Sequence, residues 1–118
     1  MQKNVKLTHS PVSPSVEVVG DMVMVLHGPY STDAVTMQFN PRIDDYKEKD
    51  DRPGVQIRQI MVTVSTPETR TAQFDFGKHN THSIVVSGRS YTVQLLSIGK
   101  EKLEGQDFPF FEFLVSWD

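Results

Sequence analysis

The chain has 118 residues, no cysteine and a formal net charge of -3, with 37% hydrophobic and 23% charged residues. This size and composition indicate one globular domain, residues 1–118, whose core needs neither disulfides nor a structural metal. The weakly acidic balance supplies no broad positive field, so nucleic acid and membrane lipid are disfavoured as partners.

Apolar runs along the chain are short. The longest nearly unbroken run, residues 22–26, is far below the ~20 residues of a membrane-spanning helix, and the first thirty residues hold no secretory apolar segment. The sequence therefore predicts a cytoplasmic protein that does not enter a membrane.

Most segments alternate apolar and polar side chains, the period of a half-buried strand. Between them, clusters of Gly, Pro, Asn, Asp and Ser recur about every ten to fifteen residues, a spacing typical of antiparallel hairpins. The sequence predicts an all-β fold, a mainly antiparallel β-sandwich or jelly-roll-like domain of about eight or nine strands. The candidate strands cover residues 4–9, 15–19, 22–27, 34–39, 55–66, 71–76, 82–87, 90–98 and 108–117.

Two hairpins carry the strongest turn signals. Residues 16–26 are expected to fold at Gly20-Asp21, and residues 83–98 at Gly88-Arg89, because Gly takes the positive φ of a primed turn.

The apolar phase slips twice, once near residues 58–59 and again between Leu95 and Leu96. Such a slip predicts a β-bulge, which bends a strand. Residues 44–51 and 100–105 are short and mostly charged, and each is expected to form at most a helical turn.

No catalytic signature stands out. His79 and His82 form a His-x-x-His pair, but a zinc site needs three or four ligands, and polar turn histidines explain the pair better. A nucleophile elbow and a phosphate-binding loop are both missing from the sequence. We therefore expect no enzymatic activity, no metal and no cofactor.

Three aromatic residues are considered as stacking surfaces for nucleic-acid bases. Phe74, Phe76 and Tyr91 could stack bases on a small barrel, but all three fall on apolar phases of their strands. We expect them in the core.

Two stretches, residues 22–26 and 108–117, are apolar on both faces. A sandwich covers only one face of each sheet, so the second face of such a strand needs another cover. That cover is either a second chain or another part of the same chain, and the sequence leaves both open.

The loop at residues 40–54 mixes five acids with four bases. Its acids are not spaced as in an EF-hand, so a solvated loop and a partner-docking loop are both more consistent with it than a calcium site.

Together these features predict a non-enzymatic protein-interaction or self-assembly module that uses apolar strand surface and the charged loop, with a protein or a second copy as partner. The alternative is a small-ligand or carbohydrate-binding β-sandwich, calcium-assisted through the acidic loop, with Tyr30, Tyr46 or Trp117 as stacking faces. The predicted partner-binding residues are Met22, Met24, Leu26, Phe111, Leu114, Asp44, Asp45 and Tyr46.

Overall fold

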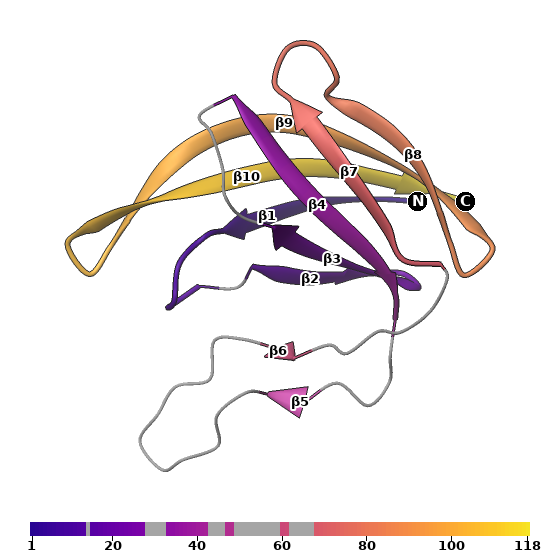
Figure 1. Cartoon of the computed structure of the whole chain (residues 1–118), viewed down its shortest axis with the longest axis horizontal. Helices are drawn as coiled ribbons and strands as arrows, with labels where there is room; N and C mark the ends of the chain where they lie inside the picture. The colour runs from indigo at the N-terminus through magenta and orange to yellow at the C-terminus, as the bar shows by residue number, and fades with distance from the viewer. Residues whose placement is uncertain (14, 28–32, 43–46, 49–59, 62–67) are drawn as a thin grey trace.

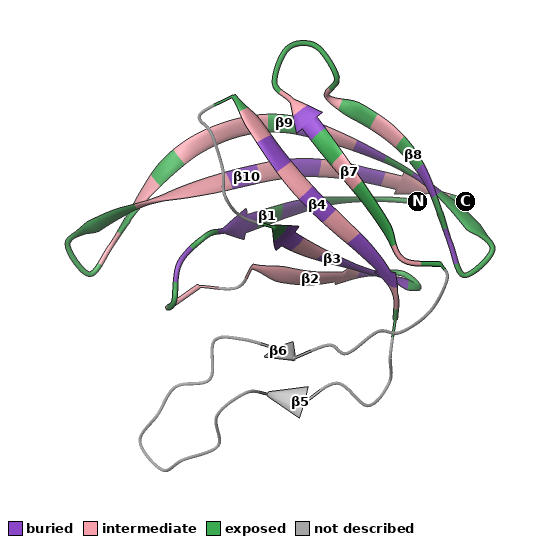
Figure 2. Ribbon diagram, in the orientation of Figure 1, coloured by how far each residue is buried: buried purple, intermediate pink, exposed green. Residues whose placement is uncertain are grey.

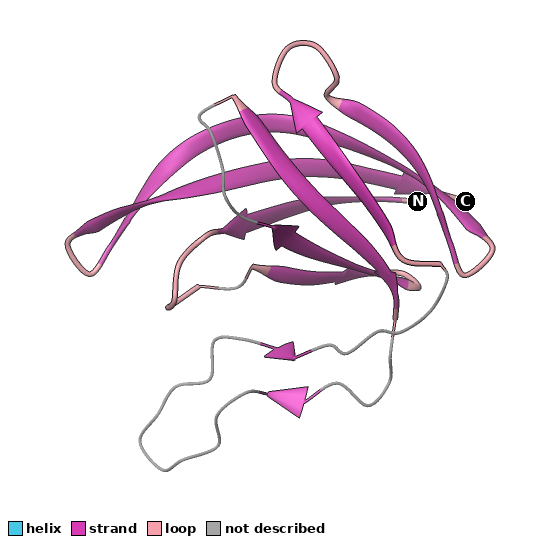
Figure 3. Ribbon diagram, viewed as in Figure 1, coloured by secondary structure: helices cyan, strands magenta, loops and turns pink. Residues whose placement is uncertain are grey.

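The computed structural model describes residues 1–13, 15–27, 33–42, 47–48, 60–61 and 68–118. Within these residues the protein is built from strands and turns and contains no helix (Figure 3). The predicted all-β class is confirmed. In chain order the strands are β1 (Gln2–Thr8), β2 (Val16–Val19), β3 (Met22–His27), β4 (Ala34–Pro41), β5 (Lys47–Glu48), β6 (Ile60–Met61), β7 (Arg70–Asp75), β8 (Thr81–Val86), β9 (Arg89–Leu103) and β10 (Gln106–Trp117).

Eight of these strands form two antiparallel sheets that pack face to face as a sandwich (Figure 1). One sheet has the order β1-β10-β9-β8 and the other has the order β2-β3-β4-β7, while β5 and β6 pair separately. Within each four-stranded sheet, neighbours follow one another along the chain, except that β5 and β6 intervene between β4 and β7 and that β10 returns to pair with β1. The connectivity is therefore up-and-down, without the Greek-key crossings of a jelly roll.

The edges of the two sheets meet at two seams, where β1 lies against β2 and β7 against β8. Side chains bridge both seams. Lys3 Nζ lies 2.9 Å from Glu17 Oε1 across the first, and His82 Nε2 lies 2.9 Å from the Gln73 carbonyl oxygen across the second. Each sheet thus shields an edge of the other from pairing with a foreign strand.

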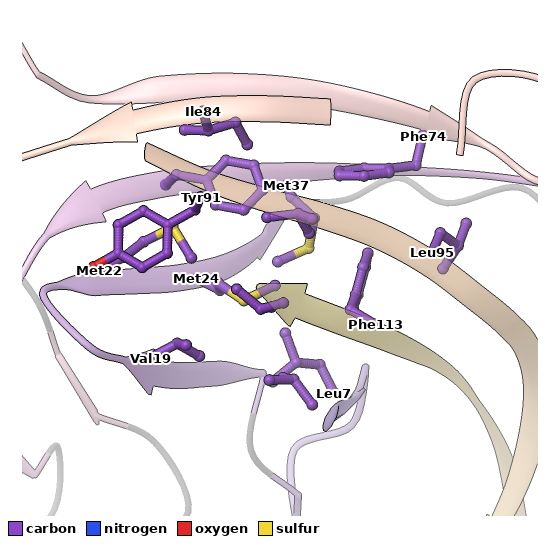
Figure 4. Packing of buried hydrophobic residues seen from close by; sticks show 14 of the residues in the cluster. Leu7, Val19, Met22, Met24, Met37, Phe74, Ile84, Tyr91, Leu95 and Phe113 are labelled. Carbon is purple, nitrogen blue, oxygen red and sulfur yellow. The ribbon is translucent and has the colours of Figure 1, made fainter. Parts of the chain in front are cut away.

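The core lies between the sheets, and burial alternates along the strands that enclose it (Figure 2). Figure 4 shows Met24 and Met37 of one sheet pointing toward Leu95 and Phe113 of the other. The rings of Phe74 and Phe113 meet edge to face, with centroids 5.4 Å apart, the geometry that aromatic pairs prefer. The buried cluster contains Val5, Leu7, Val19, Met22, Met24, Leu26, Val35, Met37, Phe39, Phe74, Ile84, Val86, Tyr91, Val93, Leu95, Phe111, Phe113 and Val115.

The core assignments of Phe74 and Tyr91 are confirmed, since neither exposes any surface. That of Phe76 is wrong: its side chain is 50% exposed. The reason is that β7 ends at Asp75, so Phe76 stands in the following turn and no longer follows the alternation of the strand.

Both predicted hairpins form. Around Gly20-Asp21, Val19 pairs with Met22, as expected. In the second hairpin the two loop residues are Ser87 and Gly88, one position earlier than predicted, and both have positive φ, 54° and 74°. This is the backbone of a primed two-residue turn.

The phase slip in β9 is a β-bulge, as predicted. Phe113 faces Leu95 and Glu112 faces Ser97, so Leu96 has no partner across the strand pair. The second predicted bulge, near residues 58–59, lies outside the described residues.

The helical turn expected at residues 100–105 is wrong. β9 continues to Leu103, and the chain reverses at Glu104 and Gly105 before β10. These charged residues pair with Gln106 to Pro109 of β10. The hydrogen bonds between the two strands override their weak local preference for a helical turn. In the stretch 44–51, residues 47 and 48 form β5.

Candidate binding face

Four of the predicted partner-binding residues lie inside the chain's own core. Met22, Met24 and Phe111 expose no surface, and Leu26 exposes 8%. They point between the sheets because they share a phase with the other core residues of β3 and β10. The structure therefore assigns these four side chains to the core and not to a partner-binding surface.

Leu114 stands on the other side of β10. Its neighbours Phe113 and Val115 are fully buried in the core, whereas Leu114 is half-buried and points away from it. The other predicted residues, Asp44, Asp45 and Tyr46, lie outside the described residues, as does Tyr30. The role of the charged loop at residues 40–54 stays a prediction.

The two doubly apolar strands differ in how their second face is covered. On β3, Val23 points away from the core and is nevertheless 0% exposed in the single chain, so its cover is intramolecular. On β10, Phe110 and Leu114 are only half-buried on the outer side. The second face of β10 is therefore the one that offers apolar surface.

The outer surface of the sheet β1-β10-β9-β8 is built from rows of side chains that lie opposite one another on adjacent strands. One row runs Gln2, Ser116, Thr92, Ser83, and the next runs Asn4, Leu114, Gln94, Thr81. With Val85, Ser90 and Leu96 at their margins, these two rows form a surface without a charged side chain, which we call the neutral face. An ordinary protein surface carries roughly 25–35% charged residues, so this stretch is depleted.

Apolar side chains stand out within the neutral face. Leu96 is 40% exposed and Val85 is 52% exposed, and Leu114 is half-buried. Leu96 is exposed because it is the unpaired residue of the bulge. Loss of charge together with exposed apolar groups is the composition found at the centres of protein interfaces.

A charged cluster bounds the neutral face on one side. Lys6 Nζ lies 3.2 Å from Glu101 Oε1, and Thr8 Oγ1 donates a hydrogen bond of 2.9 Å to Glu101 Oε2. The Thr8 hydroxyl, followed by Lys6, lowers the pKa of Glu101. Lys6 also sits 4.7 Å above the ring centre of Phe110, whose ring lies so close over Gly99 that a Cβ there would overlap it.

A hollow of about 440 Å³ lies at the other end of the neutral face. Gln2, Ser90, Thr92 and Ser116 line it together with Trp117 and the first and last residues of the chain. The half-buried Trp117 is held against the core, with its ring centre 6.0 Å from that of Tyr91. The hollow thus combines hydroxyl and amide groups of the outer surface with the Met1 ammonium and the Asp118 carboxylate, whereas the Trp117 indole lies on the core side of β10, beside Tyr91.

The histidines do not assemble a metal centre. His82 is used in the seam, where it also packs edge-on against Phe74 with ring centres 4.5 Å apart. His79 is exposed in the turn before β8, and His27 Nε2 lies 3.1 Å from Gln38 Oε1. Among the described residues, no group of three or more metal-ligating side chains comes together.

A search for helices able to cross a lipid bilayer found none in the described part of the chain. Comparisons with protein-family models, with curated proteins and with solved structures found no match to this chain.

Sequence reasoning missed most of the neutral face. The alternation of residues 90–98 already places Thr92 and Gln94 opposite Tyr91 and Val93, so their outward direction was predictable. What the sequence could not supply is that Ser116 and Gln2 stand beside Thr92, because this depends on which strands are neighbours.

Proposed function

We propose that this protein is a non-enzymatic self-assembly module, in which the neutral face of one chain packs against the neutral face of a second copy. The observation that carries the proposal is the absence of charged side chains from the two rows of the neutral face, which contain Leu114 and have Leu96 at their margin, next to the row of Lys6 and Glu112. A surface without charge can meet its own copy about a two-fold axis without placing like charges opposite each other. This matters for a chain with a net charge of -3, whose copies otherwise repel weakly.

The expected affinity is low. From strand spacing and residue rise, the neutral face measures roughly 20 Å by 20 Å, which is smaller than the ~800 Å² that each partner contributes to a standard interface. Much of that surface is hydroxyl and amide groups that lose water on association. We expect reversible dimers that form in the high-micromolar range.

Sedimentation velocity across a range of protein concentrations tests the proposal. The wild-type chain should shift from monomer to dimer as concentration rises, whereas Leu96→Asp and Leu114→Asp should remain monomeric because each places a carboxylate within the contact. Phe76→Asp is the matched control: it replaces an apolar side chain that is at least as exposed and lies off the neutral face, and it should dimerise as the wild type does.

Two outcomes would overturn the proposal. One is a wild-type chain that stays monomeric up to its solubility limit, and the other is dimerisation that persists in both Asp variants. Because Leu114→Asp could disturb folding, Gln94→Glu provides a second variant that adds charge to the face without changing side-chain size. Circular dichroism confirms that each variant is folded before its association is compared.

A further inference from the structure

We infer that the free edge of β9, residues 97–103, binds an extended acidic peptide by strand addition. β8 pairs with β9 only as far as Gln94, and next to it the Leu95 amide donates a hydrogen bond of 2.7 Å to the Asn80 carbonyl oxygen. Beyond this point β9 continues to Leu103 beside β10, past the end of β8 (Figure 1). Among the described residues, no strand pairs with the other edge of this stretch.

Such an edge presents amide and carbonyl groups that a further strand can pair with. An antiparallel strand bonds to each neighbour through every second residue, so about half of the backbone groups of residues 97–103 point to the free side. This stretch spans roughly 23 Å in strand conformation, which is long enough for a short peptide strand. The seam between β7 and β8 does not shield it, because β8 does not reach this part of β9.

Two lysines give the edge a preferred charge. Lys100 and Lys102 are both exposed and stand at alternate positions, so their side chains lie on the same side of the sheet. Across the strand pair Lys102 has Asp107 as its neighbour, whereas Lys100 has Pro109 and therefore no opposite charge. An added strand with acidic residues at alternate positions would place carboxylates opposite both lysines.

The acid between the two lysines does not cancel them on this side. Glu101 projects to the other side of the sheet, where Thr8 donates a hydrogen bond to its carboxylate and Lys6 pairs with it. The lysine side of the edge is therefore the side that selects the partner.

A second copy of this chain fits the edge less well than an acidic peptide. Two copies that pair edge to edge about a two-fold axis keep the same side of both sheets facing the same way. The Lys100 and Lys102 side chains of both chains would then gather on one side, and like charges across strands destabilise a sheet. Peptide binding at this edge is thus separate from self-assembly, which uses the neutral face.

Fluorescence anisotropy with labelled seven-residue peptides tests the inference, at a protein concentration below the onset of dimerisation. A peptide that alternates glutamate and threonine should bind saturably at low ionic strength. A peptide that alternates lysine and threonine should not bind. Absence of saturable binding by the glutamate peptide, or equal binding of both peptides, would overturn the inference.

Two further peptides separate strand addition from simple attraction between charges. One carries N-methyl groups on its glutamate amides and the other on its threonine amides, so each has one edge that cannot donate hydrogen bonds. When the glutamates face the lysines, only one edge of the peptide faces β9. Strand addition therefore predicts that one methylated peptide loses binding and the other keeps it, and equal affinities would contradict it.

Protein variants locate the site. Lys100→Gln should weaken binding of the glutamate peptide about threefold, as expected for one exposed ion pair. Lys78→Gln makes the same change of charge in the turn before β8 and should bind as the wild type does. Lys100→Glu combined with Lys102→Glu should transfer binding to the lysine peptide. Once circular dichroism shows that the variants are folded, an unchanged affinity in Lys100→Gln, an equal loss in Lys78→Gln, or no transfer in the double variant would refute the site.

Discussion

Single residues explain how the second apolar face of β10 is tolerated. Phe110 lies over Gly99, where the missing side chain leaves room for its ring, and Lys6 covers the ring from above. A glycine opposite an aromatic residue is a common device in sheets, because the ring restores the contacts that glycine lacks. Glu101 then fixes Lys6 and Thr8 in place, so that part of the apolar strand is covered by a polar cluster.

This cluster makes stability depend on pH. Hydrogen bonds from Thr8 and Lys6 lower the pKa of Glu101 below its ordinary value of 4.5 in the folded chain. Its stabilising contribution is therefore complete above pH 4.5 and is lost as the pH falls through the lower folded pKa.

We expect Glu101→Gln to be slightly less stable than the wild type at neutral pH, with the difference shrinking in acid. Urea unfolding of both proteins at pH 7 and at several values between about pH 5 and 3 measures this. The effect should be small, because the pair is largely exposed to solvent. A difference that stays constant over this range would contradict the assigned ionisation.

At the scale of elements, hairpin turns set the register of the outer sheet. The turns after β8 and β9 each place a residue with a side chain at positive φ before a glycine: Ser87 at 54° and Glu104 at 51°. The left-handed region costs most residues roughly 1 kcal/mol or more, and Asn tolerates it best. Both turns are therefore strained at one position.

Asn is the residue that primed turns favour before Gly, so Ser87→Asn and Glu104→Asn should each raise the free energy of unfolding, by about 0.5–1 kcal/mol. Ser87→Val should lower it, because a β-branched side chain resists positive φ. Chemical denaturation of the three variants tests both directions. A stabilising Val substitution at residue 87 would show that this turn does not adopt the assigned backbone.

For the whole molecule, the dominant feature is the pairing of the two ends of the chain. β1 pairs with β10, and the backbone of Met1 hydrogen-bonds with that of Trp117 (Figure 1). This pairing closes the longest loop possible in the chain, which slows folding because the loop entropy is lost before the contacts form.

A circular permutant tests this. Joining residues 1 and 118 through a short linker and opening the chain between Gly77 and Lys78, in the turn that joins strands of different sheets, converts the β1–β10 pair into a local hairpin without separating another pair of hydrogen-bonded strands. We expect the permutant to keep the native spectrum and to fold several-fold faster than the wild type in stopped-flow experiments on Trp117 fluorescence. Equal or slower folding would show that another step limits the rate.

The sequence alone determined most of the strands of the two large sheets, most of their inward residues and the bulge beside Leu95, because each of these depends on the two-residue period and on turn chemistry that act locally. The local pattern could not decide which face of a strand that is apolar on both sides points into the core. Phe111 and Leu114 differ by an odd number of positions, so one had to face the core and the other had to face away, but only sheet packing decided which. The tertiary structure also decided that Gln2, Ser116 and Thr92 form one surface, because strand order is set by hydrogen bonds between residues far apart in the chain.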